Sequence, residues 1–112
     1  MSANAKLAPA TGEWRRVCRV EDIPALGARV VGSAAGRIAV FRGAGDEVFA
    51  LEDRCPHKGG PLSQGIVLGK QVSCPLHGWL IGLDDGEAVA PDRGCVKRFG
   101  VRVDNGEVFL QL

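Results

Sequence analysis

Hydrophobic and polar residues alternate along the first half of the chain. Residues 14–20 alternate loosely between apolar and charged side chains, and residues 29–31, 37–42 and 48–52 form further short apolar runs. Gly-rich links separate these runs. Because successive side chains of a strand point to opposite faces, this pattern predicts half-buried strands joined as a meander.

The C-terminal end of the chain predicts a β-hairpin. Residues 96–103 and 107–111 alternate in the same way and flank the sequence Asp104-Asn105-Gly106. The Asn-Gly pair favours the tight turn that joins two antiparallel strands. We therefore expect the chain to end on a paired strand.

Between these regions, residues 53–92 lose the regular alternation. Three of the six prolines (Pro56, Pro61 and Pro75) lie here, among several glycines. This segment is predicted to be a loop-rich insert in the β scaffold. By contrast, residues 1–12 are rich in small and polar side chains, which predicts a flexible tail preceding one domain over residues 13–112.

Length and composition support a single all-β domain. The chain has 112 residues, of which 46% are hydrophobic and 24% charged. Sixteen Gly and six Pro favour many tight turns over a helical bundle. A formal charge of +1 gives no basic surface for nucleic acid or anionic lipid. No apolar run approaches the roughly 18 residues of a membrane span, and no signal peptide is visible, so we expect a cytoplasmic protein.

Both histidines of the chain lie close to a cysteine. The sequence Cys55-Pro56-His57 is followed, after sixteen residues, by Cys74-Pro75-Leu76-His77. Each half offers one thiolate and one imidazole, and in a reducing compartment such cysteines are more often metal ligands than disulfides. Structural zinc sites usually pair cysteines before histidines, whereas this chain alternates them, so zinc is the second interpretation.

The spacing of these four residues resembles that of the Rieske iron–sulfur proteins. The resemblance implies a Rieske fold: a β-sandwich-like base of antiparallel strands that carries a small cluster-binding subdomain, here about residues 53–92. It also implies one [2Fe–2S] cluster, with Cys55 and Cys74 on one iron and His57 and His77 on the other. The remaining cysteines, Cys18 and Cys95, are interpreted as small buried residues or free thiols.

The residues around the ligands predict a low redox potential. Hydrogen bonds to the sulfurs stabilise the reduced cluster. High-potential members of the family carry an extra disulfide and Ser and Tyr hydroxyl donors. This chain has Leu76, Trp79 and Ile81 among the corresponding positions, and it has no Tyr. It resembles the ferredoxin-type branch, near the lower end of the Rieske range.

A further stretch of sequence resembles one particular group of Rieske proteins. The ligand motifs continue into Gly86-Glu-Ala-Val-Ala-Pro-Asp-Arg-Gly-Cys-Val-Lys-Arg-Phe99, which is similar to the small subunit of bacterial assimilatory NAD(P)H-dependent nitrite reductase. The resemblance implies a non-autonomous subunit that works with a large subunit carrying FAD, a [4Fe–4S] cluster and sirohaem, which reduces nitrite to ammonia. The chain has no dinucleotide-binding Gly-x-Gly-x-x-Gly motif of its own.

Two other functions stay open. Gly78, directly after the second His, also occurs in stand-alone Rieske ferredoxins, which pass electrons from a flavin reductase to an aromatic-ring-hydroxylating dioxygenase. The third possibility is a structural metal-binding module that holds zinc and is colourless. The absorption spectrum of the protein, and whether a large chain co-purifies with it, distinguish the three functions.

Overall fold

The protein is built from nine β-strands and three short 3-10 turns in the computed structural model, which describes residues 14–33, 36–56, 59–76 and 78–111. The strands are β1 (Trp14–Arg19), β2 (Ala28–Ser33), β3 (Gly36–Arg42), β4 (Val48–Glu52), β5 (Ile66–Leu68), β6 (Gln71–Ser73), β7 (Leu80–Gly82), β8 (Arg98–Asp104) and β9 (Glu107–Gln111). The turns are η1 (Val20–Asp22), η2 (Ala44–Asp46) and η3 (Leu62–Gln64). The predicted tail, residues 1–12, lies outside the described residues.

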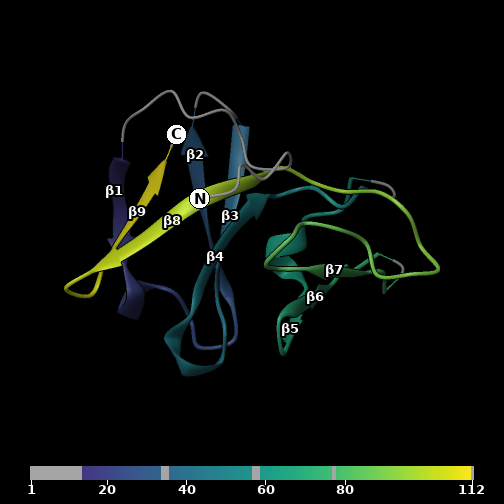
Figure 1. Ribbon diagram of the computed structural model, residues 1–112, viewed down its shortest axis with the longest axis horizontal. Helices are drawn as coiled ribbons and strands as arrows, with labels where there is room; N and C mark the ends of the chain where they lie inside the picture. The colour runs from purple at the N-terminus through teal and green to yellow at the C-terminus, as the bar shows by residue number, and fades with distance from the viewer. Residues whose placement is uncertain (1–13, 34–35, 57–58, 77, 112) are drawn as a thin grey trace.

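The strands form a large and a small antiparallel sheet. Six strands pair in the order β1-β9-β8-β4-β3-β2, and three pair in the order β5-β6-β7. Figure 1 shows the small sheet to one side of the large one. The chain enters the small sheet after β4 and returns to the large sheet at β8. The all-β class, with an antiparallel base and a smaller attached unit, is confirmed.

Strand β3 is buried on both faces. Ile38 and Val40 pack into one hydrophobic core with Ala50 of β4, whereas Ala39 and Phe41 pack into a second core. All four of these β3 residues are 0% exposed. This explains the uninterrupted apolar run in the sequence, because a strand covered on both faces needs no polar positions.

The two cores lie on opposite faces of the large sheet. The first core draws buried side chains from β1, β3, β4, β8 and β9, so the sheet must curl around it. The second core joins β3 and β4 to the small sheet through Val67, Val72 and Ile81. Both proposed cysteine ligands belong to this second core. The small sheet is therefore held against the base by the packing that surrounds them.

The predicted C-terminal hairpin is confirmed. Strands β8 and β9 pair from Gly100↔Gln111 to Asp104↔Glu107. Asn105 and Gly106 have φ of 55° and 78°. Two successive positive φ values match the turn type for which Asn-Gly is preferred.

The middle segment contains more structure than its sequence predicts. The small sheet lies inside residues 53–92, where the alternation is weak, and each of its strands has only three residues. Runs of this length are too short to show a period of two. Gly69, with φ of 61°, makes the turn between β5 and β6.

Trp14, a large apolar residue at the start of β1, lies outside both cores. Its side chain is 37% exposed. The Arg102 guanidinium lies 5.2 Å from the centre of the Trp14 ring and 4.9 Å from that of Phe109. The ring thus packs against a neighbouring cation on the outside of the sheet, where cation–π attraction offsets part of its exposure.

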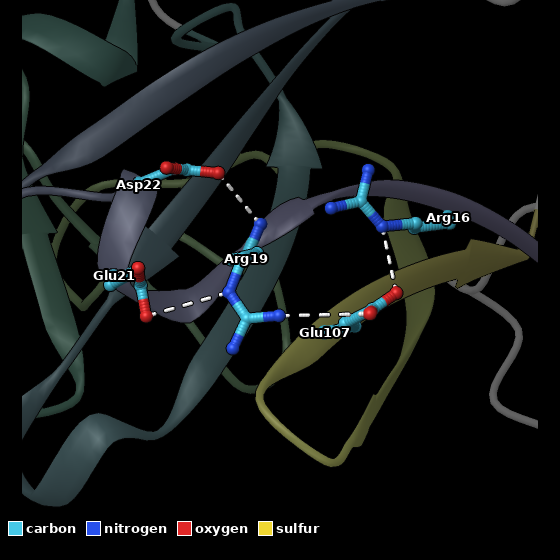
Figure 2. Close-up of polar contacts among 5 residues, drawn as sticks. All are labelled: Arg16, Arg19, Glu21, Asp22 and Glu107. Atoms are coloured by element: carbon cyan, nitrogen blue, oxygen red, sulfur yellow. Dashed lines mark hydrogen bonds and ion pairs between the residues drawn. The ribbon is translucent and has the colours of Figure 1, made fainter.

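Charged contacts fasten β1 to its neighbours. The Arg16 Nε donates to Glu107 Oε1 at 2.7 Å, and Arg19 lies between Glu107 and Glu21 (Figure 2). The Asp22 carboxylate accepts a hydrogen bond from the backbone N–H of Arg19. These are surface ion pairs, which contribute little to stability individually. Together these contacts link β1 to β9 and to the turn η1.

Candidate functional site

Cys55 and Cys74 are buried in the same hydrophobic core. Their exposed fractions are 1% and 3%, and both pack among the apolar side chains that join the two sheets. Cys55 follows the end of β4, and Cys74 directly follows β6. Two thiols from segments far apart in the sequence are thereby brought to one place.

The two cysteines start loops with the same backbone hydrogen bonds. The Cys55 N–H donates to the Gly60 carbonyl at 2.8 Å, and the Gly59 N–H donates to the Cys55 carbonyl at 2.9 Å. Cys74 makes the equivalent bonds with Trp79 and Gly78, at 2.7 and 3.0 Å.

A glycine at the same place in each loop permits this shape. Gly59 and Gly78, each four residues after the cysteine, have φ of 73° and 72°. Side chains other than glycine rarely adopt such values. The two loops are therefore a repeated structural unit, each of which starts at a buried cysteine.

The two loops lie directly against each other. A Cβ atom on Gly60 would lie 2.8 Å from Leu76 Cγ and 3.3 Å from Cys74 Sγ. The absence of a side chain at Gly60 therefore lets the first loop approach the sulfur of the second. The sequence analysis missed this role of Gly60. The only indication of it in the sequence is the Gly59-Gly60 pair.

His57 and His77 lie outside the described residues. Within the described ranges, no three His, Cys, Asp or Glu side chains gather as a metal site. The donor chemistry that is described suits an iron–sulfur cluster, because thiolates are the ligands that hold such clusters and both thiols are shielded from water by apolar side chains.

A third segment approaches the first ligand loop. A Cβ on Gly94 would lie 2.9 Å from Pro56 Cβ, and the Ala88 N–H donates to the Gly94 carbonyl at 2.9 Å. The segment that contains Gly94 thus contacts the Cys55 loop at Pro56. Trp79 is half-buried and packs against the same core as both cysteines.

The other two cysteines take no part in this arrangement. Cys18 is buried in the core of the large sheet, whereas Cys95 is exposed. Neither forms a disulfide. Burial raises the pKa of the Cys18 thiol, as does nearby Asp22, while Arg29 and Arg16 oppose the rise. The thiolate is the reactive form, so the raised pKa and the burial of the side chain together make Cys18 inert.

We expect a thiol reagent to distinguish these two cysteines. In the folded protein Cys95 should react readily, while Cys18 should react only after unfolding, because it is both buried and protonated. Mass spectrometry of the labelled protein measures this, with Cys18→Ala as the control for assignment. Equal labelling of both thiols in the folded protein would contradict the assigned burial.

Comparison with known families agrees with this geometry. The family model of the Rieske [2Fe–2S] domain matches residues 13–100, which include both cysteine loops. The chain belongs to the Rieske [2Fe–2S] family. The expected cofactor, a Rieske-type [2Fe–2S] cluster, and electron transfer as the general role follow from this membership.

Similar proteins within the Rieske family include ferredoxins. The chain is 44% identical over 89 residues to the ferredoxin subunit of anthranilate 1,2-dioxygenase from Burkholderia cepacia, which covers 79% of this chain and 78% of that protein. Among solved structures, it is 32% identical to a chain in the complex of reduced oxygenase and oxidised ferredoxin of carbazole 1,9a-dioxygenase. The TM-score is 0.75, and the match covers 85% of this chain and 98% of that one.

A solved structure described as the small subunit of a nitrite reductase (NADPH) is also similar. It is 25% identical with a TM-score of 0.78, and the match covers 89% of this chain and 99% of that one. The chain also matches larger oxygenases, but it spans only 24% and 11% of the length of two of them. No helix in the described part of the chain has the length and hydrophobicity needed to cross a membrane.

Proposed function

We propose that this protein is a Rieske ferredoxin that passes single electrons to an oxygenase, with Cys55, His57, Cys74 and His77 as the cluster ligands. The observation that carries the proposal is the pair of matched loops, which bring together two buried thiols, each followed in the sequence by a histidine two or three residues later. The cluster, when bound, supplies a site that accepts and releases one electron.

The protein's own residues determine how this site works. The buried thiols of Cys55 and Cys74 would hold one iron, and the apolar side chains around them keep water away from their sulfurs. The neutral imidazoles of His57 and His77 would hold the other iron. Replacing two thiolates by imidazoles makes the cluster less negative, which raises its potential relative to an all-cysteine cluster.

Similarity along most of the chain supports the ferredoxin assignment. The ferredoxin relatives and this chain cover most of each other's length. An electron carrier needs only a cluster and a surface around it, and a domain of this size supplies both.

The second candidate is a nitrite reductase small subunit. It is supported by residues 86–99, whose sequence resembles that family, and by the similar fold of one such subunit. In this case the chain would act with a large subunit that carries FAD, a [4Fe–4S] cluster and sirohaem. Both candidates use the same four ligands.

Isolation from the native host distinguishes the two candidates. We expect the tagged protein, purified anaerobically, to show a Rieske electron paramagnetic resonance (EPR) signal without a large flavin- and sirohaem-containing chain. It should also transfer electrons to an aromatic-ring oxygenase after reduction by a flavin reductase. Co-purification of a stable large chain with flavin and sirohaem absorption would overturn the ferredoxin assignment in favour of nitrite reductase.

We also expect a midpoint potential near the lower end of the Rieske range, which runs from about −150 to +300 mV. The physical reason is that the positions after the second ligand loop carry the apolar side chains of Trp79 and Ile81, where hydroxyl donors to sulfur would raise the potential. A redox titration followed by EPR measures it. A strongly positive midpoint would show that other donors reach the sulfurs.

A further inference from the structure

The first ligand loop is closed by a side chain, whereas the second is closed by strand pairing. The Cys74 loop leaves β6 and enters β7, and Ser73 pairs directly with Leu80 across its base. The Cys55 loop leaves β4 but runs into the turn η3, so no strand pair joins its two ends. Instead, a carboxylate bridges them.

That carboxylate belongs to Asp53, two residues before Cys55. Its Oδ1 accepts a hydrogen bond from the Ser63 backbone N–H at 2.7 Å, and its Oδ2 accepts one from the Ser63 hydroxyl at 2.8 Å. The Asp53 side chain is 0% exposed. Two hydrogen bonds from one residue to a buried carboxylate fix both its position and its orientation.

A second contact ties Asp53 to the large sheet. Its backbone N–H donates to the Arg37 carbonyl at 3.0 Å. The Arg37 guanidinium, which is 69% exposed, lies 3.7 Å from the carboxylate. Strand β3 therefore holds Asp53, and Asp53 in turn holds Ser63, so the chain is fixed on both sides of Cys55.

We propose that Asp53 is a positioning residue for the cluster: with Ser63 it closes the Cys55 loop, and its buried negative charge favours the oxidised cluster. This inference rests on the proposed function only in taking Cys55 as a ligand. A fixed loop holds the Cys55 sulfur in place when the electron arrives. A buried anion nearby disfavours the added negative charge of the reduced cluster.

Three variants test the proposal in the full-length protein loaded with its cluster. Asp53→Ala removes the bridge. Asp53→Asn keeps it, since the amide can accept from the Ser63 N–H and donate to the Ser63 hydroxyl, but it removes the charge. Asp46→Asn is the matched control, because Asp46 is an exposed carboxylate paired with Arg42 at the other end of β4.

We expect Asp53→Ala to lose its cluster at least about tenfold faster than the wild type, because it removes both hydrogen bonds from Ser63 to the carboxylate. Visible absorbance follows the loss. Hydrogen exchange should speed up in residues 53–63 and not in β8 and β9. Asp53→Asn should restore most of the cluster lifetime while its midpoint potential rises, and Asp46→Asn should leave both unchanged.

Two results would overturn the proposal: a wild-type rate of cluster loss in Asp53→Ala, or an Asp53→Asn variant that loses the cluster as fast as Asp53→Ala with no change in potential. A wild-type protein that binds no cluster would instead refute the ligand assignment. In that case hydrogen exchange in residues 53–63 still decides whether Asp53 closes the loop.

Discussion

Replacing Cys74 with alanine is expected to abolish the Rieske EPR signal while the large sheet stays folded. The Cys74 sulfur lies in the core between the two sheets, beside Gly60 of the other ligand loop. The large sheet keeps its own separate core, which does not include Cys74. Absorption and EPR spectra measure the cluster, and far-ultraviolet circular dichroism measures the fold.

The same result is expected for His57→Ser and His77→Ser, because each removes one proposed ligand of the cluster. Cys18→Ala is the matched control, since it also removes a buried thiol but from the core of the large sheet. An unchanged signal in any of the three ligand variants would remove that residue from the site. Loss of the signal in Cys18→Ala would mean that the loss reflects general instability.

Replacing Gly65 with alanine is expected to destabilise the small sheet strongly. A Cβ at this position would overlap the Ser73 carbonyl oxygen and approach Val72 Cγ2 to 2.9 Å. Ser73 precedes Cys74, so the strands can make room only by displacing a ligand. We expect a loss of about 3 kcal/mol in the free energy of unfolding, at the upper end for overpacked sites, and a shorter cluster lifetime.

The matched control for this variant is Gly32→Ala on β2. A Cβ there meets nothing within 4 Å, so only a small change in stability is expected. Thermal unfolding, followed in the far ultraviolet and at the visible absorption of the cluster, compares the two variants. If Gly65→Ala unfolds at the wild-type temperature, the small sheet is not packed as described.

The strands of the base could be predicted because their sequence carries local information. The alternation in residues 14–20 and the Asn105-Gly106 turn each specify a structure within a few residues, and the structure contains β1, β8 and β9 where they predict them. The small sheet could not be predicted, because its three-residue strands are defined by pairing between β5, β6 and β7. Pairing between distant residues leaves no period in the sequence.

The ligand motifs were visible in the sequence because both histidines lie close to a cysteine at a spacing specific to the family. The residues that support the ligands were not. Asp53 and Ser63 are ten positions apart and meet only in the folded chain. Likewise, the need for Gly60 arises from the approach of Leu76 and Cys74, which belong to the other loop.

The most direct test of the central claim is the EPR spectrum and iron content of the purified, reduced protein. The account predicts a Rieske-type signal with two irons per chain, lost in the His57→Ser and His77→Ser variants. A colourless protein that binds zinc, or a cluster signal that survives both histidine substitutions, would contradict it.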